Sequence, residues 1–415
     1  MPQGLNHRLA DVARQVGTPA YVYDMEIVAE RFATLKTLFG RHFGVSYAVK
    51  ANPNIALMQR IRPLISTFDV SSFGEVERAL AAGMPADRIT FSGPVKRPVE
   101  IRRAIELGIG ELVLESLAES DHANAFAAAA GIRQPVLIRV NPATVTARFG
   151  VNMAGKASQF GIDEEVFDAA ITHILGLAHL ELVGFHIYSG TNSLNSDAIA
   201  DNFALFIKLF RQGARTAGLR PRRLVFGSGF GLPYVDGEKS LDVEAVAARV
   251  MPMMDALKAD PVFADTECNL EMGRWLVGSA GWLLTKVIAE KSSRGVAIRM
   301  CDAGFNNHLA ACGMMGTVIR RNWQFSNVSH PDGGRHAYTL VGPLCTTIDV
   351  LATDVQLPTL HVGDVVAVAN SGAYGLSASP TRFISHPEPV EVILAGDQCI
   401  DATESRLNHW QTAGD

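Results

Sequence analysis

The fold is decided around one short run, Val45-Ser46-Tyr47-Ala48-Val49, which passes directly into Lys50-Ala51-Asn52-Pro53. Its β-branched and aromatic residues are typical of a buried strand, and the asparagine and proline end that strand. Lys50 therefore stands where a strand stops. Partial removal from water at such a place favours the neutral amine, which can form an imine with an aldehyde. The ordinary alternative is a lysine that extends from a strand end into solvent.

Seven further runs of this kind follow, separated by segments of helical period such as residues 75–82, 98–107 and 197–217. We place the eight candidate strands near residues 44–49, 67–70, 89–92, 112–114, 136–140, 182–188, 223–226 and 268–270. Such alternation is typical of successive βα units with a parallel sheet. Eight units favour an α/β fold, a closed (β/α)8 TIM-like barrel, over an open sheet.

After Trp275 the pattern changes to strand-like runs broken by Gly, Pro and Asn. These runs lie near residues 282–288, 296–300, 336–340, 365–369 and 390–394. A chain of 415 residues also exceeds what one hydrophobic core normally holds. We therefore predict a barrel over residues 29–275 and a C-terminal mainly-β domain formed by residues 276–415 together with residues 1–28.

Composition and charge exclude several classes of protein. The formal net charge of −5 indicates no basic surface for nucleic acid, and no window approaches the roughly 18 apolar residues of a membrane-spanning helix. Residues 1–17 mix polar and apolar side chains, unlike a signal peptide, so we expect a cytoplasmic protein. The five cysteines include no CxxC pair, so neither a disulfide framework nor a metal site is indicated.

Two more polar segments follow predicted strands. Residues 226–231 read Phe-Gly-Ser-Gly-Phe-Gly, and small residues at such a place let backbone N–H groups surround a phosphate. The alternative is a tight turn that uses glycines for its backbone conformation alone. The eighth strand ends in Glu271-Met272-Gly273-Arg274, whose charges could equally form a structural ion pair. With Lys50 these groups are the set that pyridoxal 5'-phosphate needs: an amine, a phosphate loop, an arginine, and a carboxylate for the pyridine nitrogen.

These segments belong to a longer ordered series of motifs. The series comprises residues 47–52, 69–75, 139–142, 226–234, 271–274, 301–304, 342–345 and 372–375. It resembles the diaminopimelate/ornithine decarboxylase family of pyridoxal-phosphate enzymes, which are built on an alanine-racemase-like barrel, and the resemblance covers roughly residues 18–394. It implies an amino-acid decarboxylase with a second, β-rich domain.

The resemblance also implies roles for individual residues at the cofactor. Lys50 would hold the cofactor as a Schiff base with Asp69 nearby, and Glu271 would face the pyridine nitrogen. The groups expected around the phosphate are Thr191, Gly227, Ser228, Gly229, Arg274 and Tyr374. The family's ring-stacking histidine corresponds to Tyr188 in an ungapped alignment, with His186 two positions earlier, and either ring could stack.

Cys345 is the second catalytic residue that the resemblance implies. It would come from the partner subunit of a homodimer and return a proton to the substrate carbon after CO2 is lost, so two subunits would build each active site. By itself a free cysteine is more often a small buried hydrophobic residue. Its neighbours Gly342-Pro343 and Thr346-Thr347 instead indicate a loop that presents the thiol.

The chain departs from the family at positions that would contact the substrate. Diaminopimelate decarboxylases carry a glutamate directly after the cysteine, where this chain has Thr346, and an arginine expected within residues 306–311 is missing. Residues 379–383 also differ from the family's aromatic-Asn element. Thr346 and Asp349 are the candidate substrate contacts. Without either distal charge partner, free diaminopimelate would bind poorly.

Residues 153–161, 344–349 and 383–387 are similar to a secondary-metabolism branch of the family, which decarboxylates conjugated amino acids in siderophore assembly or glutamate on a carrier protein. We therefore predict decarboxylation of an L- or D-configured amino-acid centre on a small, conjugated or carrier-linked substrate. The alternatives are a diaminopimelate decarboxylase of lysine biosynthesis, an amino-acid racemase, and a noncatalytic carrier of the cofactor. Glu271 argues against the racemase, which would place an arginine at the ring nitrogen, and the long second domain argues against the carrier.

Overall fold

The computed structural model describes residues 3–144, 151–152, 155, 157–314 and 321–404. The chain divides into two compact units. The barrel unit comprises Phe32–Leu232 and Ser240–Gly273. The β-rich unit comprises Met1–Arg31, Pro233–Lys239 and Arg274–Asp415. Of the predicted branch segment 153–161, residues 153, 154 and 156 lie outside the described part.

The barrel unit contains a closed sheet of eight parallel strands. Their order is β5-β4-β3-β2-β12-β11-β9-β6, and pairing of β5 with β6 closes the circle. The strands are β2 (Phe43–Ala48), β3 (Thr67–Val70), β4 (Ile89–Phe91), β5 (Glu111–Leu114), β6 (Gln134–Asn141), β9 (Leu180–Ile187), β11 (Arg223–Gly227) and β12 (Glu267–Met272). Each predicted strand is present, and the predicted (β/α)8 barrel is confirmed.

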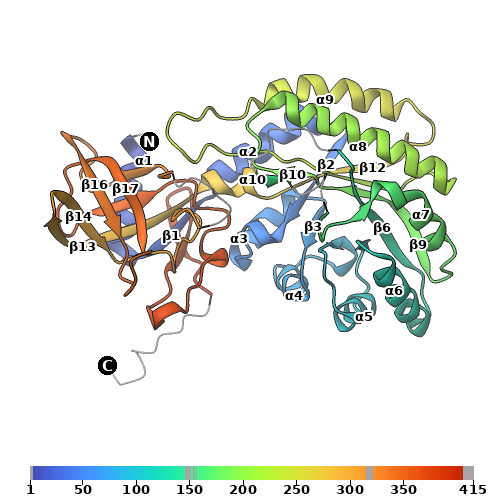
Figure 1. The fold of residues 1–415 in the computed structure, drawn as a ribbon, viewed down its shortest axis with the longest axis horizontal. Coiled ribbons are helices and arrows are strands. Elements are labelled where there is room, and N and C mark those ends of the chain that lie inside the picture. Colours follow the sequence, from blue (N-terminus) through green and yellow to red (C-terminus); the bar gives the residue numbers. More distant parts are fainter. Residues whose placement is uncertain (1–2, 145–150, 153–154, 156, 315–320, 405–415) are drawn as a thin grey trace. The chain divides into compact units, whose positions relative to one another are not determined.

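Helices precede or connect these strands in the chain and lie outside the sheet (Figure 1). They are α2 (Met25–Phe39), α3 (Ile55–Ile61), α4 (Phe73–Ala81), α5 (Pro98–Glu106), α6 (Leu117–Ala130), α7 (Phe167–Leu175), α8 (Ser196–Ala217) and α9 (Val243–Lys258). The longest of these, α8, begins where the Asn195 side chain accepts a hydrogen bond from the Ala198 N–H, and ends at Gly218 in a left-handed conformation. Its buried Phe210 packs edge-on against Phe226 of β11, which fixes the helix against the strand that carries the glycine loop.

The β-rich unit is built on a mixed sheet with the strand order β17-β16-β14-β13-β1-β19-β20, and β18 also pairs with β13 and β15. Its strands are β1 (Ala20–Asp24), β13 (Gly281–Ser293), β14 (Val296–Cys301), β15 (Phe325–Asn327), β16 (Arg335–Val341), β17 (Val350–Pro358), β18 (Val365–Val368), β19 (Val390–Ala395) and β20 (Gln398–Asp401). The mainly-β character of this region is confirmed. Helix α1 (Gln3–Val16) buries Leu9 and Ala13 in the same core as Val22 and Trp282.

Within the described residues, no helix has the length and apolar character needed to cross a bilayer. The same residues contain no group of three or more His, Cys, Asp or Glu side chains that could hold a metal ion.

Candidate active site

Lys50 lies at the carboxyl end of β2. The strand stops at Ala48, and Val49–Ala51 form a single 3-10 turn, with the Tyr47 hydroxyl donating to the Asn52 carbonyl oxygen at 3.0 Å. Val49 and Ala51 are buried, whereas the Lys50 side chain is 38% exposed. The turn therefore anchors the backbone and leaves the amine at the open rim of the barrel.

Two buried carboxylates flank this amine. The Lys50 Nζ lies 3.7 Å from Oε1 of Glu271 and 4.0 Å from Oδ2 of Asp69, and both acidic side chains are 2% exposed. They meet there because β12 and β3 pair with the two edges of β2, and parallel strands end at the same rim. The fold thus brings together Lys50, Asp69 and Glu271, three of the residues that were expected at the cofactor.

The two acids differ in their electrostatics. Burial alone would raise the pKa of Glu271, but the Lys50 charge and the contact with His186 lower it below its usual range. Burial raises the pKa of Asp69, and the neighbouring Glu271 charge raises it further. Glu271 is therefore the stronger acid of the two.

His186 and Tyr188 have different neighbours. His186 on β9 is 1% exposed, and its Nε2 lies 2.6 Å from Oε2 of Glu271. Tyr188 follows β9, and its ring centroid lies 5.5 Å from the Lys50 Nζ. A Cβ at Gly227 would come within 2.7 Å of the Tyr188 Cγ, so the ring lies directly against the glycine loop. The histidine contacts the acid, and the tyrosine faces the amine.

The glycine loop after β11 is bound to the end of β12. The backbone N–H and the hydroxyl of Ser228 both donate to the Glu271 carbonyl oxygen, at 3.2 and 3.1 Å. Gly229 has a left-handed φ of 68°, and its carbonyl accepts from the Ser193 N–H at 2.9 Å. Thr191 lies in the short strand β10 (Gly190–Thr191), two residues before Ser193. The structure therefore joins the phosphate-loop candidates of the barrel unit to the same rim as Glu271.

Arg274 and Tyr374 belong to the β-rich unit. Arg274 is the first residue of helix α10 (Arg274–Val277). Its Nη1 donates to the Tyr234 hydroxyl at 2.7 Å, and its Cζ lies 4.6 Å from the Tyr374 ring centroid. Tyr374 has a left-handed φ of 53°. The two predicted residues are thus in contact. Tyr234 was missed as a candidate, although it ends the 226–234 motif of the sequence.

Cys345 and Thr346 lie in the loop between β16 and β17, where the Cys345 thiol is exposed. Asp349 holds this loop to residues 303–305, because its Oδ1 accepts from the Phe305 N–H and its Oδ2 from the Leu344 N–H, each at 2.8 Å. Both oxygens of Asp349, a predicted substrate contact, therefore accept hydrogen bonds from backbone N–H groups, one in this loop and one at Phe305. His308 is an ordinary core histidine, and burial lowers its pKa to about 3.

A buried ionic network also lies at the strand ends of the barrel. Arg139 on β6 bonds Glu115 at 2.9 Å, and Lys96 lies 3.1 Å from Glu119. The positive charge of Arg139 also lowers the pKa of Glu271. Arg139 lies in the 139–142 motif, but its sequence position alone predicts no role, because its partner Glu115 is 24 residues away in the chain.

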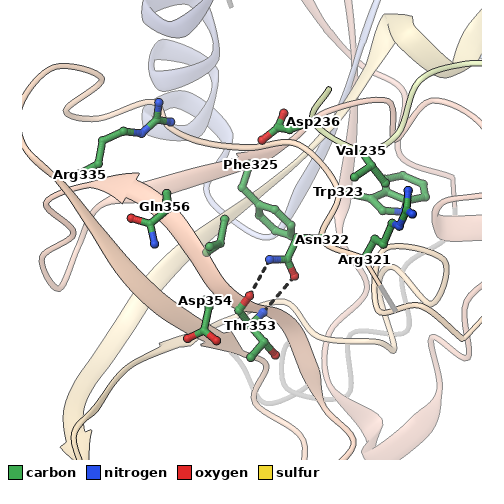
Figure 2. Close-up of a pocket in the computed structure, with 11 residues that line it drawn as sticks. Val235, Asp236, Arg321, Asn322, Trp323, Phe325, Arg335, Thr353, Asp354 and Gln356 are labelled. Carbon is green, nitrogen blue, oxygen red and sulfur yellow. Dashed lines mark hydrogen bonds between the residues drawn. The ribbon is translucent and has the colours of Figure 1, made fainter. Parts of the chain in front are cut away.

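The β-rich unit contains a separate cavity of about 590 Å³ (Figure 2). It is lined by Val235, Asp236, Arg321, Asn322, Trp323, Phe325, Arg335, Thr353, Asp354, Val355 and Gln356. Asn322 bridges to the backbone of Thr353 through both its amide nitrogen and its oxygen. None of these lining residues is one of the predicted site residues.

The residues at the barrel rim fit pyridoxal phosphate. A partly exposed amine and a buried carboxylate of lowered pKa lie at one rim, and the cofactor requires the first group at its aldehyde and the second at its pyridine nitrogen. The glycine loop passes so close to Tyr188 that even a methyl group at Gly227 would not fit, and small residues in such a loop let a phosphate approach its backbone.

Comparison with known proteins identifies the family. The model for "Pyridoxal-dependent decarboxylase, pyridoxal binding domain" matches residues 25–278. The chain is 33% identical to the L-glutamyl-[BtrI acyl-carrier protein] decarboxylase of Niallia circulans, over 92% of this chain and 90% of that protein. It is 28% identical to the 2-[(L-alanin-3-ylcarbamoyl)methyl]-2-hydroxybutanedioate decarboxylase of Staphylococcus aureus, over 90% of this chain and 93% of that protein.

Among solved structures, the diaminopimelate decarboxylase of Helicobacter pylori complexed with L-lysine superimposes with a TM-score of 0.85 at 28% identity, covering 96% of each chain. The cofactor is accordingly pyridoxal phosphate, and the reaction class is removal of a carboxyl group from an amino acid. The chain belongs to the family of pyridoxal-dependent decarboxylases.

Proposed function

We propose that this decarboxylase acts on an amino acid joined to a larger group, at an L- or D-configured centre, rather than on free diaminopimelate. The observation that carries the proposal is the lack of charge beside the cysteine loop. Residues 306–311 contain no lysine or arginine, the residue after Cys345 is Thr346, and His308 is neutral because burial lowers its pKa to about 3. A free distal ammonium and carboxylate would find no ionic partner in these segments.

Two relatives support a conjugated substrate. The protein from Niallia circulans acts on glutamyl groups attached to an acyl-carrier protein. The protein from Staphylococcus aureus acts on an amino acid joined through an amide to a hydroxybutanedioate. In both names the amino acid is attached to a second group. A role in siderophore assembly or in carrier-linked biosynthesis is part of this proposal.

The geometry of the barrel rim supports the proposed cofactor contacts of Lys50, Asp69 and Glu271. Lys50 holds the aldehyde carbon, Glu271 faces the pyridine nitrogen, and Asp69 lies beside the lysine. The phosphate contacts that we propose are Thr191, Gly227, Ser228, Gly229, Arg274 and Tyr374. When bound, pyridoxal phosphate withdraws electrons from the substrate Cα, so that the carboxyl group can leave as CO2.

Cys345 is the proposed proton donor to that carbon. Its thiol is exposed on the loop between β16 and β17, as a group shared with a second subunit needs to be. We propose a homodimer in which each subunit supplies Cys345 to its partner. We also propose a barrel domain of residues 29–275 and a β-rich domain that forms the subunit interface. A cytoplasmic location is proposed as well, because it suits a chain whose five cysteines are free thiols.

Steady-state kinetics of CO2 release test the substrate class. The panel contains meso-diaminopimelate, free L-glutamate, a citrate-linked diamino acid, and glutamate loaded on a carrier protein. We expect kcat/KM for one conjugate to exceed that for free diaminopimelate at least 100-fold. Thr346→Glu, which restores a carboxylate after the cysteine, should narrow this ratio, and Thr347→Glu is the matched control. If the enzyme turns over free diaminopimelate as well as every conjugate, the proposal is refuted in favour of a diaminopimelate decarboxylase of lysine biosynthesis.

A further inference from the structure

We propose that His186 is a positioning residue for Glu271: its neutral imidazole donates from Nε2 to one oxygen of the ionised carboxylate and directs the other oxygen toward the pyridine nitrogen. The inference rests on the proposed role of Glu271 at the cofactor. It also gives the two rings different places, with Tyr188 beside the Lys50 amine and His186 against the Glu271 carboxylate.

The contact is short and buried. The His186 Nε2 lies 2.6 Å from Oε2 of Glu271, at the short end of the range for a hydrogen bond from nitrogen to oxygen, and the two side chains are 1% and 2% exposed. β11 separates β9 from β12 in the sheet, so the two side chains meet inside the barrel across one intervening strand. The Oε1 atom of the same carboxylate lies on the Lys50 side, 3.7 Å from Nζ. The histidine thus fixes which edge of the acid faces the amine.

The second ring nitrogen indicates where the protons are. Within the described residues, the buried Nδ1 of His186 has no hydrogen-bond partner. A histidine cation, or a neutral ring that accepts a proton from Glu271, would each bury an unpaired Nδ1–H. A neutral ring that donates from Nε2 buries only an unpaired acceptor, and unpaired buried N–H groups are rarer than unpaired acceptors. The Nε2–H tautomer beside an ionised Glu271 is therefore the arrangement with the lowest cost.

A neutral donor suits the charges around the acid. The cations that lower the pKa of Glu271 include Lys50 after β2 and Arg139 on β6. Arg139 is already bonded to Glu115 at 2.9 Å, and the Glu271 charge raises the pKa of the neighbouring Asp69 on β3. A histidine cation would neutralise the carboxylate at the point where a protonated pyridine nitrogen needs it. A neutral imidazole orients the carboxylate and leaves its charge intact.

Substitutions of His186 test the inference on the protein loaded with ¹⁵N-labelled pyridoxal phosphate. His186→Leu removes the donor, whereas His186→Gln keeps an N–H near the position of Nε2. We expect the ring-nitrogen chemical shift to move toward the unprotonated value in His186→Leu, the cofactor Kd to rise at least tenfold, and His186→Gln to restore most of both. The matched controls are His42→Leu and His42→Gln, because the His42 Nε2 also lies 2.6 Å from a carboxylate oxygen, that of Asp255. These two substitutions should leave both the nitrogen shift and the cofactor Kd unchanged.

A measurement on the unsubstituted protein does not depend on how the variants fold. With ¹⁵N-labelled histidine, the His186 resonances should show the neutral Nε2–H tautomer at the pH at which the enzyme is assayed. A cationic ring or the Nδ1–H tautomer overturns the inference, as does a wild-type nitrogen shift in His186→Leu. An unchanged nitrogen shift in Glu271→Gln would instead refute the proposed role of Glu271, so the two failures are distinguishable.

Discussion

Substituting Gly227 by alanine should damage the cofactor site through lack of space alone. An added Cβ would lie 2.7 Å from Cγ and 2.8 Å from Cα of Tyr188. Carbon atoms rest about 3.5 to 4.0 Å apart, so the methyl group overlaps both the ring and the backbone of the turn after β9. The ring can rotate away, but Cα can move only with the turn.

The cost follows from this overlap. Inserting a methyl group into a well-packed region typically costs about 1–3 kcal/mol, and we expect the free energy of unfolding of the apoprotein to fall by that amount in Gly227→Ala. Displacement of Tyr188 and the loop should also raise the Kd of pyridoxal phosphate at least tenfold, which is about 1.4 kcal/mol. Urea-induced unfolding and cofactor titration by absorbance measure the two effects.

Gly74→Ala is the matched control for this experiment. Gly74 is exposed in α4, and an added Cβ would meet only the Ser72 hydroxyl oxygen, at 3.8 Å. Alanine is the better helix former by up to about 1 kcal/mol, so this variant should be as stable as the wild type or more stable. A Gly227→Ala protein with wild-type stability and a Kd within twofold of the wild type would refute the packing argument.

Three other substitutions give distinct outcomes. Lys50→Ala should abolish the visible absorbance of bound cofactor and its fixation by borohydride, and retained absorbance would contradict the role of the amine. Cys345→Ala should keep that absorbance while the yield of the normal amine product falls, so a full yield would exclude the thiol as proton donor. Burial and the Glu271 charge raise the pKa of Asp69, so its ionisation lowers stability as the pH rises above the unfolded value of about 4. Urea unfolding of the apoproteins gives the difference in free energy of unfolding between Asp69→Asn and the wild type. This difference should favour the variant more at pH 8 than at pH 4, and an equal difference at both pH values would count against this linkage.

The sequence by itself determined the barrel and most of its rim. Strand and helix periods are local properties, so the positions of all eight barrel strands could be read without any knowledge of contacts. Lys50, the glycine loop and Glu271 each directly follow or end a strand, and parallel strands bring their carboxyl ends to one rim. That rule alone predicts that the amine and the acid meet, and the distance between them is 3.7 Å.

Other features depended on which strands become neighbours. The β1 strand pairs with β13 and β19, whose residues lie more than 250 positions away, and neither partner can be read from the five residues of β1. The use of both Asp349 oxygens by backbone N–H groups likewise depends on how two loops pack.

The different places of His186 and Tyr188 were decided only by the tertiary structure. Both are aromatic and they are two residues apart at the end of one predicted strand, so local pattern does not distinguish them. The register of β9 against β11, and of β11 against β12, sets the depth of each ring in the barrel. That register is a property of the closed sheet as a whole, and it places the histidine at the acid and the tyrosine at the amine.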